Sequence, residues 1–433
     1  MNILWITNVP LPEASKLMND EPVPFGGWLI NAAAGLQNDQ NLKMSIAFPR
    51  NGFEEVQMIK GEKIRYYPFP YLTTKNIIQN KHHLIKIIEH TKPDIVHIFG
   101  TEFYHTSVIV DICNTKNINV VISLQGLVTF IAKHYMNGIP EKIQNHFTLR
   151  DLLRLDNIKM QQKKFFKRGK YEIEAIRNVN HVIGRTTWDR ACTSIFNQVA
   201  KYYHCNETLR NTFYNHYWNI NECEKYSIFL SQGSYPIKGF HYMVEAMSMI
   251  VSEFPESKLY VGGTDITIAK TLKDKARLSA YGKYIKAQIK KNNLQNHIIF
   301  TGVMDERKMC DQYLKSHVFV CPSTIENSPN SLGEAMMLGL PIVASNVGGI
   351  SDLLTHKNEG YLYQSDAPYM LAYYICEIFR NEEIALKFSE KARQKAKMTH
   401  DKEQNHKRLL DIYKVIIEEG NIYKKGEFYE SIS

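Results

Sequence analysis

The sequence alternates between short apolar runs and segments with helical periodicity, and this alternation restricts the possible folds more than any other feature. Each run ends in a polar or glycine-containing turn, and segments between runs, such as residues 240–254, have a helical pattern. Such alternation favours βα units and parallel sheets. The runs lie at residues 2–8, 95–100, 119–126 and 181–186 and, in a second series, at 226–233, 258–263, 297–302, 317–323 and 341–345.

The two series of runs predict two parallel-sheet domains. Residues 210–225, between the series, are polar and aromatic without clear periodicity, so we place the boundary there. We expect an N-terminal Rossmann-like domain at residues 1–215 and a C-terminal one at 216–395. The remaining residues, 396–433, contain a segment with a helical pattern that is expected to close at Gly420. Ligands of open parallel sheets bind beyond the carboxyl ends of the strands, so the turns are the places to search.

Charge and cysteine usage narrow the class of protein. Lys and Arg number 53 against 44 Asp and Glu, and the formal net charge of +9 favours an anionic partner such as a nucleotide, a phospholipid surface or nucleic acid. The seven cysteines are odd in number and none has CxxC spacing, so we expect a reducing compartment without a disulfide framework. The first residues read as a strand rather than a signal peptide, and no stretch reaches the roughly 18 to 20 apolar residues of a membrane helix.

Two glutamates, Glu326 and Glu334, flank a predicted turn into a short helix that begins near Ser331 and ends at Gly339. Taken alone, Ser331 and Glu334 match a capping box, and Glu326 matches a solvated loop residue. The alternative is a ligand site, because free amide groups at a helix start bind anions and carboxylates accept hydrogen bonds from vicinal sugar hydroxyls. The amides in question belong to Asn330, Ser331 and Leu332.

The stretch "PSTIENSPNSLGEAMMLGLPIVASNVGGISDLL" decides between these interpretations. It resembles the signature of family-4 glycosyltransferases, namely Glu-x7-Glu around a Pro-Asn-x-Leu turn, then Glu-Ala-Met and a Gly-x-Pro-Val segment ending in Gly-Gly. The resemblance is strong over residues 226–365 and weaker in the N-terminal half. It implies an α/β protein of the GT-B fold, in which two Rossmann-like parallel-sheet domains face a central cleft. The domain at 1–215 would then lie on the acceptor side, the domain at 216–395 would bind the nucleotide-sugar, and the helix within 396–433 would cross back toward the N-terminal domain.

Within the resemblance, two glutamates and one lysine have defined roles. Glu326 would face the donor hexose as a catalytic residue, and Glu334 would hold the nucleotide ribose. Lys238, in the turn "SQGSYPIKG", matches the catalytic lysine that neutralises charge on the leaving diphosphate; a solvated turn lysine is the alternative. The arginine that usually accompanies it falls on Gly233, so that cation is missing. Gly233 and Ser234 remain donor-binding candidates.

Other turns supply the further donor contacts that the resemblance implies. Gly26 and Gly27 match a glycine-rich turn after the first strand, where the backbone can approach the diphosphate. Gly302 and Val303 end the strand that would cradle the base. Gln125 occupies the position of a histidine that contacts the donor sugar in many members, and glutamine can hydrogen-bond a hydroxyl but cannot carry charge.

Two other side chains near these turns each have two interpretations. His97 is interpreted as a strand residue packed in the sheet rather than as a substitute for the missing histidine. Arg185 either supplies the cation missing at Gly233 or forms a structural salt bridge with Asp189.

The resemblance implies retaining, metal-independent transfer of a hexose or N-acetylhexosamine from a nucleotide-sugar, expected to be a UDP-sugar, to a glycan or lipid-linked acceptor in bacterial surface polysaccharide biosynthesis. No metal or other cofactor is expected, because the departing diphosphate can itself take the acceptor proton while the protein positions the reactants. Two alternatives remain: a GT-B nucleotide-sugar epimerase and a non-catalytic sugar-nucleotide-binding partner.

A basic segment at residues 159–170 suits a membrane surface. Its lysines and one arginine surround Phe165 and Phe166, a composition that favours the anionic inner face of the plasma membrane. A solvated helix face is the alternative, and nothing else in the sequence resembles a nucleic-acid module. We therefore expect a cytoplasmic protein with peripheral membrane contact and no nucleic-acid partner.

Overall fold

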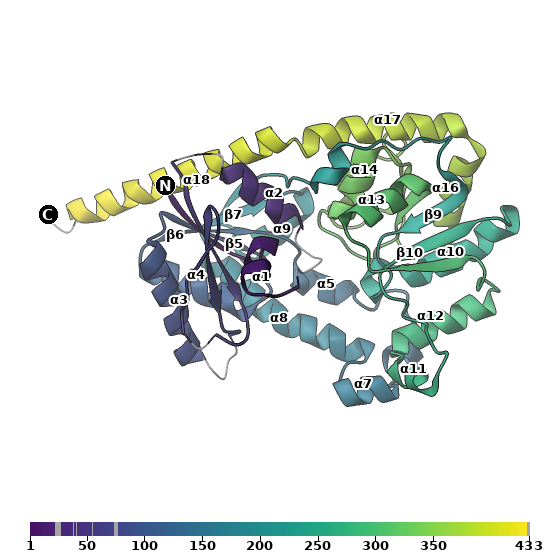
Figure 1. Ribbon diagram of the computed structural model, residues 1–433, viewed down its shortest axis with the longest axis horizontal. Coiled ribbons are helices and arrows are strands. Elements are labelled where there is room, and N and C mark those ends of the chain that lie inside the picture. The colour runs from purple at the N-terminus through teal and green to yellow at the C-terminus, as the bar shows by residue number, and fades with distance from the viewer. Residues whose placement is uncertain (22–26, 38, 40, 54, 73–76, 431–433) are drawn as a thin grey trace. The chain divides into compact units, whose positions relative to one another are not determined.

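In the computed structural model the chain forms two compact units, each built on its own sheet (Figure 1). The structure describes residues 1–433 except 22–26, 38, 40, 54, 73–76 and 431–433. Unit 1 comprises residues 1–129, 167–208 and 400–433, and unit 2 comprises residues 130–166 and 209–399. Residues 130–166 therefore group with the C-terminal sheet, although the sequence-based boundaries assign them to the N-terminal domain.

The sheet of unit 1 has eight strands in the order β3-β4-β2-β1-β5-β6-β7-β8, parallel except for the β3–β4 pair. Its central strands are continuous apolar runs, and β5 is buried along its whole length, as expected for a parallel sheet covered on both faces. The strands are β1 (Asn2–Ile6), β2 (Lys43–Pro49), β3 (Ile59–Lys60), β4 (Ile64–Phe69), β5 (Ile95–Phe99), β6 (Asn119–Ser123), β7 (His181–Gly184) and β8 (Lys201–His204).

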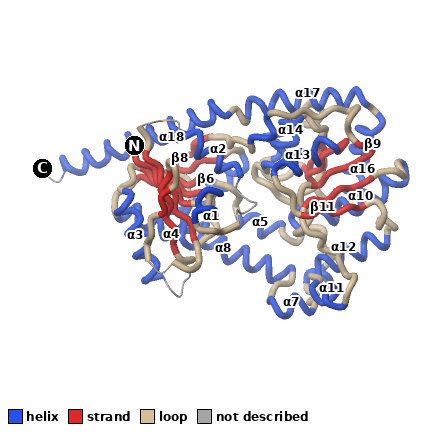
Figure 2. The backbone as a smooth tube through the Cα atoms, in the orientation of Figure 1, coloured by secondary structure: helices blue, strands red, loops and turns tan. Residues whose placement is uncertain are grey.

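The helices of unit 1 follow these strands and cover the sheet (Figure 2). They are α1 (Pro12–Leu17), α2 (Gly27–Leu36), α3 (Ile77–Thr91), α4 (Tyr104–Thr115), α9 (Thr187–Phe196) and α18 (Lys402–Glu430). Two more, α5 (Val128–His134) and α8 (Ile158–Asn178), contain the points where the chain passes between the units.

The sheet of unit 2 has six strands, all parallel, in the order β11-β10-β9-β12-β13-β14. They are β9 (Glu224–Leu230), β10 (Lys258–Gly262), β11 (Ile298–Gly302), β12 (Ser316–Cys321), β13 (Ile342–Ser345) and β14 (Tyr361–Tyr363). Every apolar run singled out in the sequence is a strand, so the prediction of two parallel sheets is confirmed.

The helices of unit 2 include two short ones from its N-terminal segment, α6 and α7, and the longer α10, α12, α16 and α17. The α-helices are α6 (Glu141–Gln144), α7 (Leu149–Arg154), α10 (Phe240–Glu253), α11 (Leu272–Arg277), α12 (Ala280–Lys291), α13 (Glu306–Lys315), α14 (Asn330–Leu338), α15 (Ile350–Leu353), α16 (Pro368–Arg380) and α17 (Glu382–Thr399), and the 3-10 turns are η1 (Asn211–Tyr214) and η2 (Pro236–Lys238). Among the described residues, none of the helices combines the length and apolar character required to cross a bilayer.

The C-terminal helix α18 completes the core of unit 1. Tyr413 is fully buried, and its hydroxyl accepts a hydrogen bond of 3.0 Å from the indole of Trp5 and lies 2.5 Å from Nδ1 of His97. The prediction that α18 closes at Gly420 is wrong, because the helix continues to Glu430. A Cβ at position 420 would lie 2.0 Å from Oδ1 of Asn119, so glycine serves close packing there rather than helix termination.

Candidate active site

The carboxylate of Glu326 is held by Lys238 at the carboxyl end of the unit 2 sheet. Glu326 lies in the loop between β12 and α14, and the Nζ of Lys238 donates a hydrogen bond of 2.6 Å to its Oε1. The hydroxyl of Ser323 donates a second, of 2.8 Å, to the same oxygen. Burial works against the charge of Lys238, but the neighbouring carboxylate outweighs it and raises the pKa of Lys238 above its usual value.

Two glycines allow the backbone to bring these side chains together. Gly239 has φ of +68°, and a Cβ there would lie 1.7 Å from the carbonyl oxygen of Pro322. Gly348 has φ of +54°, and a Cβ there would lie 1.9 Å from the carbonyl oxygen of Glu326. Only glycine combines this conformation with this closeness. The Lys-Gly and Gly-Gly parts of the sequence pattern therefore fix the loops that carry Lys238 and Glu326.

The second glutamate, Glu334, forms a buried bidentate ion pair with Arg210. The Nε and Nη2 of Arg210 donate to the two carboxylate oxygens at 2.7 and 2.8 Å, and Glu334 is only 5 % exposed. The guanidinium also lies over the ring of Phe213, 4.8 Å from its centroid. Burial lowers the pKa of Arg210, but the bond and charge of Glu334 outweigh this and leave it raised.

This pair overturns the capping-box interpretation of Ser331 and Glu334. Helix α14 has Pro329 at its N-cap and no capping side chain, and the carboxylate of Glu334 is bound to Arg210 instead. The helix itself is confirmed, with Gly339 as a left-handed C-cap at φ of +80°. The expectation of a free amide at Leu332 is wrong, because that amide donates to the carbonyl of Pro329 at 3.0 Å.

The turn after β9 shows why the family's arginine is absent. Gly233 is buried, and a Cβ at this position would lie 2.6 Å from Cγ1 of Val261, so a long side chain has no room without a shift of the neighbouring strand. Ser234, next along the turn, lines a pocket of about 470 Å³ within unit 2.

Gly302 ends β11 with φ of +76°, and Val303 beyond it is exposed. All these candidates lie at the carboxyl ends of strands, as the sequence pattern predicted.

In unit 1, Gln125 and Arg185 follow β6 and β7 and are both bound to Glu207. The amide of Gln125 donates to Oε1 of Glu207 at 2.7 Å, and Nη1 of Arg185 contacts Oε2 at 2.7 Å. Arg185 also donates to the carbonyl of Leu124 at 3.1 Å and is 6 % exposed. These side chains line a small, partly open pocket of about 40 Å³, enough for a few water molecules.

Arg185 forms a structural salt bridge, but its partner is Glu207 and not the predicted Asp189. The carboxylate of Asp189 accepts the backbone N–H of Arg185 and forms a capping box with Thr186 at the start of α9. The guanidinium of Arg185 pairs with Glu207 instead. That Arg185 replaces the cation missing at Gly233 stays a prediction.

Three further candidates have separate outcomes. The interpretation of His97 as a packed strand residue is confirmed, because it is 1 % exposed in β5 and burial lowers its pKa to about 3. Gly27 is the first residue of α2, and Gly26 lies outside the described residues. Since α1 lies between β1 and Gly27, the glycines do not directly follow the first strand.

Arg210 and Glu207 are the site residues that the sequence interpretation missed. Arg210 lies in the segment treated as a domain boundary, and Glu207 lies just before it. Neither residue belongs to a recognisable motif. Arg210 binds Glu334, which is 124 positions away in the sequence, and Glu207 binds Gln125, which is 82 positions away. The local indication that the sequence does offer is that Arg210 is a charged residue in a polar stretch without clear periodicity.

Comparison with known proteins identifies the region that carries most of this geometry. Residues 213–395 match the family model Glycosyl transferases group 1. This region is a group 1 glycosyl transferase domain. The domain contains Lys238, Glu326 and Glu334, while Arg210 lies three residues before the matched range.

A curated relative and two solved structures extend the comparison. The poly(glycerol-phosphate) alpha-glucosyltransferase of Bacillus subtilis is 26% identical over 170 residues, which are 39% of this chain and 23% of that protein. Sucrose-phosphate synthase from Thermosynechococcus elongatus has a TM-score of 0.70 at 14% identity, covering 96% of this chain and 99% of that chain. Anabaena HepE in complex with UDP-glucose has a TM-score of 0.64 at 14% identity, covering 95% and 100%.

The solved structures and the curated relatives support different conclusions. The structural ones show the fold alone and confirm the GT-B class, in which each of two domains is built on a Rossmann-like parallel sheet. The chain spans less than half the length of the curated relatives it matches.

Proposed function

We propose that this protein is a retaining, metal-independent glycosyltransferase that moves a hexose or N-acetylhexosamine from a nucleotide-sugar, specifically a UDP-sugar, to a glycan or lipid-linked acceptor. The observation that carries this proposal is the contact of 2.6 Å between Lys238 and Glu326 inside a group 1 domain. A half-buried cation and carboxylate at the ends of parallel strands form a polar site prepared before the ligand arrives. HepE, a structural neighbour, is described in complex with UDP-glucose, which supports the choice of donor.

In the proposed mechanism Lys238 stabilises the charge that develops on the departing diphosphate. Glu326, held by Lys238 and Ser323, orients the donor hexose. The bond between the anomeric carbon and the diphosphate oxygen breaks, and the acceptor oxygen bonds to that carbon from the same face. The leaving phosphate takes the acceptor proton, so the protein supplies position and charge.

The pair of Arg210 and Glu334 is compatible with ribose binding. An ionised carboxylate has about four acceptor positions, of which Arg210 occupies two and leaves about two for the vicinal hydroxyls of a ribose. The bidentate pair also fixes the carboxylate in one orientation, so no rotamer freedom is lost when the nucleotide binds. Backbone groups of Asn330 and Ser331, with Gly233, Ser234, Gly302 and Val303, complete the proposed donor contacts in unit 2.

Unit 1 would contribute through the same scheme. Gln125 and Arg185 are proposed to contact the donor, with Glu207 holding both side chains in place, and Gly26 and Gly27 are proposed to approach the diphosphate.

We also propose a cytoplasmic location at the inner face of the plasma membrane and a role in bacterial surface polysaccharide biosynthesis. The exposed lysines of residues 159–170 are proposed to contact anionic lipid, and no nucleic-acid partner is proposed.

The test is a titration of the wild type, Glu334→Ala and Lys238→Gln with UDP, GDP and ADP and their common sugars by calorimetry without added metal. We expect one nucleotide to bind and both variants to bind it more weakly, while Glu382→Ala, at an exposed position, binds like the wild type. Absence of binding by every nucleotide, or unchanged binding by both variants, would refute the donor-site assignment.

Turnover separates a transferase from the two alternatives. With the bound nucleotide's sugar as donor, we expect release of the nucleoside diphosphate, with slow hydrolysis to the free sugar when no acceptor is present. Recovery of an epimerised nucleotide-sugar would instead identify an epimerase. Tight binding without any release of nucleoside diphosphate would identify a binding partner.

A further inference from the structure

The helix α7 (Leu149–Arg154) has its polar and apolar sides reversed relative to an ordinary surface helix. Its aspartate, Asp151, is fully buried, whereas Leu152 and Leu153 are exposed and Leu153 reaches 79 %. Leu149, at the start of the helix, and the flanking Phe147 and Leu155 are exposed as well. Isolated exposed leucines are common on proteins, but a consecutive group of them indicates an interaction site.

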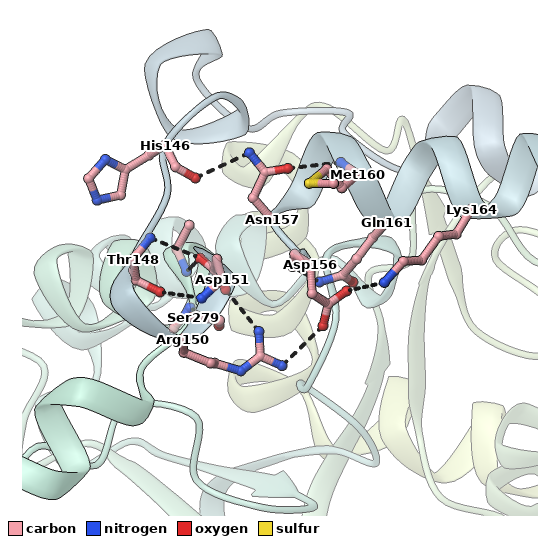
Figure 3. A network of polar contacts seen from close by, with 12 residues as sticks. His146, Thr148, Arg150, Asp151, Asp156, Asn157, Met160, Gln161, Lys164 and Ser279 are labelled. Carbon is pink, nitrogen blue, oxygen red and sulfur yellow. Dashed lines mark hydrogen bonds and ion pairs between the residues drawn. The ribbon is translucent and has the colours of Figure 1, made fainter. Parts of the chain in front are cut away.

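The buried polar side of α7 fixes the helix on unit 2 (Figure 3). Asp151 closes a capping box with Thr148, accepts 2.8 Å hydrogen bonds from Nη1 of Arg150 and from the backbone N–H of Ala280, and thereby joins α7 to the start of α12. Arg150 extends the network to Asp156 at 3.3 Å. Because polar contacts hold the helix, the fold does not require its leucines.

The residue that ends α7 supports this conclusion. Leu155 is the C-cap and has φ of +46°, in the left-handed region where glycine or asparagine is usual. Its side chain is 60 % exposed, so packing within the protein does not compensate for that conformation. An apolar side chain is therefore presented to the surroundings at a position where the backbone favours a different residue.

Helix α11 lies beside α7 and carries basic residues (Figure 1). At the start of α11, Leu272 is 83 % exposed and adds to the apolar group. The acidic residues closest in sequence are engaged, since Asp274 caps α11 through Thr271 and Asp156 pairs with Arg150 and Lys164. We call this region the leucine face: apolar Phe147, Leu149, Leu152, Leu153, Leu155 and Leu272, bordered by exposed Arg154, Lys159, Lys270, Lys273 and Lys275.

We infer that the leucine face docks on an anionic lipid bilayer, with the leucines among the acyl chains and the basic border at the headgroups. Apolar tips bordered by lysine and arginine are the composition of interfacial membrane anchors. A second copy of the chain fits less well, because symmetric contact would bring two positive borders together. The inference rests on the proposed function and deepens it, by assigning the membrane contact to a defined surface outside the donor site.

The experiment is vesicle co-sedimentation of the full chain without nucleotide, using phosphatidylcholine alone and phosphatidylcholine with an equal amount of phosphatidylglycerol. We expect binding to the anionic vesicles only, and weaker binding at high salt. The double variant Leu152→Gln/Leu153→Gln should partition at least about tenfold more weakly, because two large apolar side chains no longer leave water. The matched control Leu386→Gln/Met398→Gln, at exposed positions of α17, should bind like the wild type.

Charge is tested separately from apolar contact. Lys273→Gln/Lys275→Gln should weaken binding to the anionic vesicles, whereas Lys290→Gln/Lys291→Gln on α12 should change it less. Wild-type protein that stays in solution with anionic vesicles, or leucine variants that sediment like the wild type, would overturn the inference. So would a wild-type dimer in analytical ultracentrifugation that the leucine variants convert to a monomer. Nucleotide calorimetry needs no vesicles, so failure of the donor site and failure of the leucine face are distinguishable.

Discussion

Arg210 and Glu334, 124 positions apart in the sequence, form a bidentate ion pair at 2.7 and 2.8 Å in the interior of unit 2. Glu334 lies on α14, while Arg210 directly precedes the turn η1, so the pair ties the start of unit 2's long segment to the helix that carries the proposed ribose contact. A carboxylate that is 5 % exposed is stable as an ion only with such a partner. The pair therefore connects the stability of the unit to the orientation of the carboxylate that is proposed to contact the ribose.

Substituting Arg210 by alanine should affect stability and nucleotide binding together. The variant leaves a buried carboxylate without its cation, and we expect the free energy of unfolding to fall by about 3 kcal/mol or more. Binding of the nucleotide should weaken as well, because Glu334 loses its fixed orientation. Urea unfolding and calorimetry measure the two effects, and Arg307→Ala, at an exposed position, is the control. Unchanged stability in Arg210→Ala would contradict the importance of the pair.

The local part of this arrangement was predictable from the sequence, and the long-range part was not. Helix α14 and its glycine C-cap follow from a proline, a periodic apolar pattern and Gly339, all within a dozen residues. Which residue pairs with Glu334 depends on how two segments more than a hundred residues apart come together in the fold, and no local sequence pattern indicates this. The predicted capping box failed for this reason, because an arginine in a distant segment binds the same carboxylate more strongly than a backbone amide.

Among the strands, too, some were predicted from the sequence and others were missed. Continuous apolar runs such as β5 and β12 were predicted because they are buried along their whole length. The strands β2, β3, β4, β8 and β14 were missed. Of these, β4 contains Arg65 and Pro68, β3 and β14 have only two and three residues, and β2 was missed although it is buried from its second residue on. Edge and near-edge strands carry polar residues that a central parallel strand excludes, so their pattern is weaker.

Gly239 should tolerate alanine much less well than another glycine of similar conformation. In Gly239→Ala the new Cβ meets the carbonyl of Pro322 at 1.7 Å, so the backbone that carries Lys238 must move. We expect a loss of several kcal/mol in the free energy of unfolding, on the order of 3, and a large loss of turnover. Gly52→Ala is the matched control, because Gly52 also has positive φ but no atom within 4 Å of a new Cβ. Equal losses in the two variants would show that backbone strain alone is responsible.

Histidine 97 should make stability depend on pH in the acidic range. Burial lowers the pKa of His97 to about 3 in the folded protein, from 6.5 in the unfolded chain. The unfolded state therefore binds a proton more readily, and the stability that neutral His97 supports is complete above pH 6.5 and declines as the pH falls toward 3. Between pH 6.5 and 5 the decline is about 1.6 kcal/mol.

Urea unfolding of the wild type and of His97→Gln at several pH values checks this expectation. The variant is expected to be less stable at neutral pH, because it loses the hydrogen bonds to Tyr413 and Ser123, yet to lose less stability on acidification. His216→Gln, at an exposed position, should keep the wild-type slope. An identical slope in His97→Gln would mean that His97 is protonated in the folded protein.

Glu207 and Arg185 should show strong energetic coupling. Arg185 is 6 % exposed, so Glu207→Gln leaves a buried cation with only carbonyl partners and is expected to lower the free energy of unfolding by about 3 kcal/mol. Arg185→Met should cost a similar amount, because it leaves the Glu207 carboxylate without its cation. The double variant removes both charges and should lose much less than the sum of the two single losses.

A double-mutant cycle by urea unfolding measures this coupling, and the exposed pair of Lys225 and Glu382 offers the matched control. That pair has the same type of contact at 3.0 Å, but water solvates both partners, so its coupling should be close to zero. Additive losses at Glu207 and Arg185 would mean that the pair is solvated despite its burial. A large coupling would instead establish that Glu207 fixes the guanidinium of Arg185, and with it the side chain of Gln125, at the end of the unit 1 sheet where a donor contact is proposed.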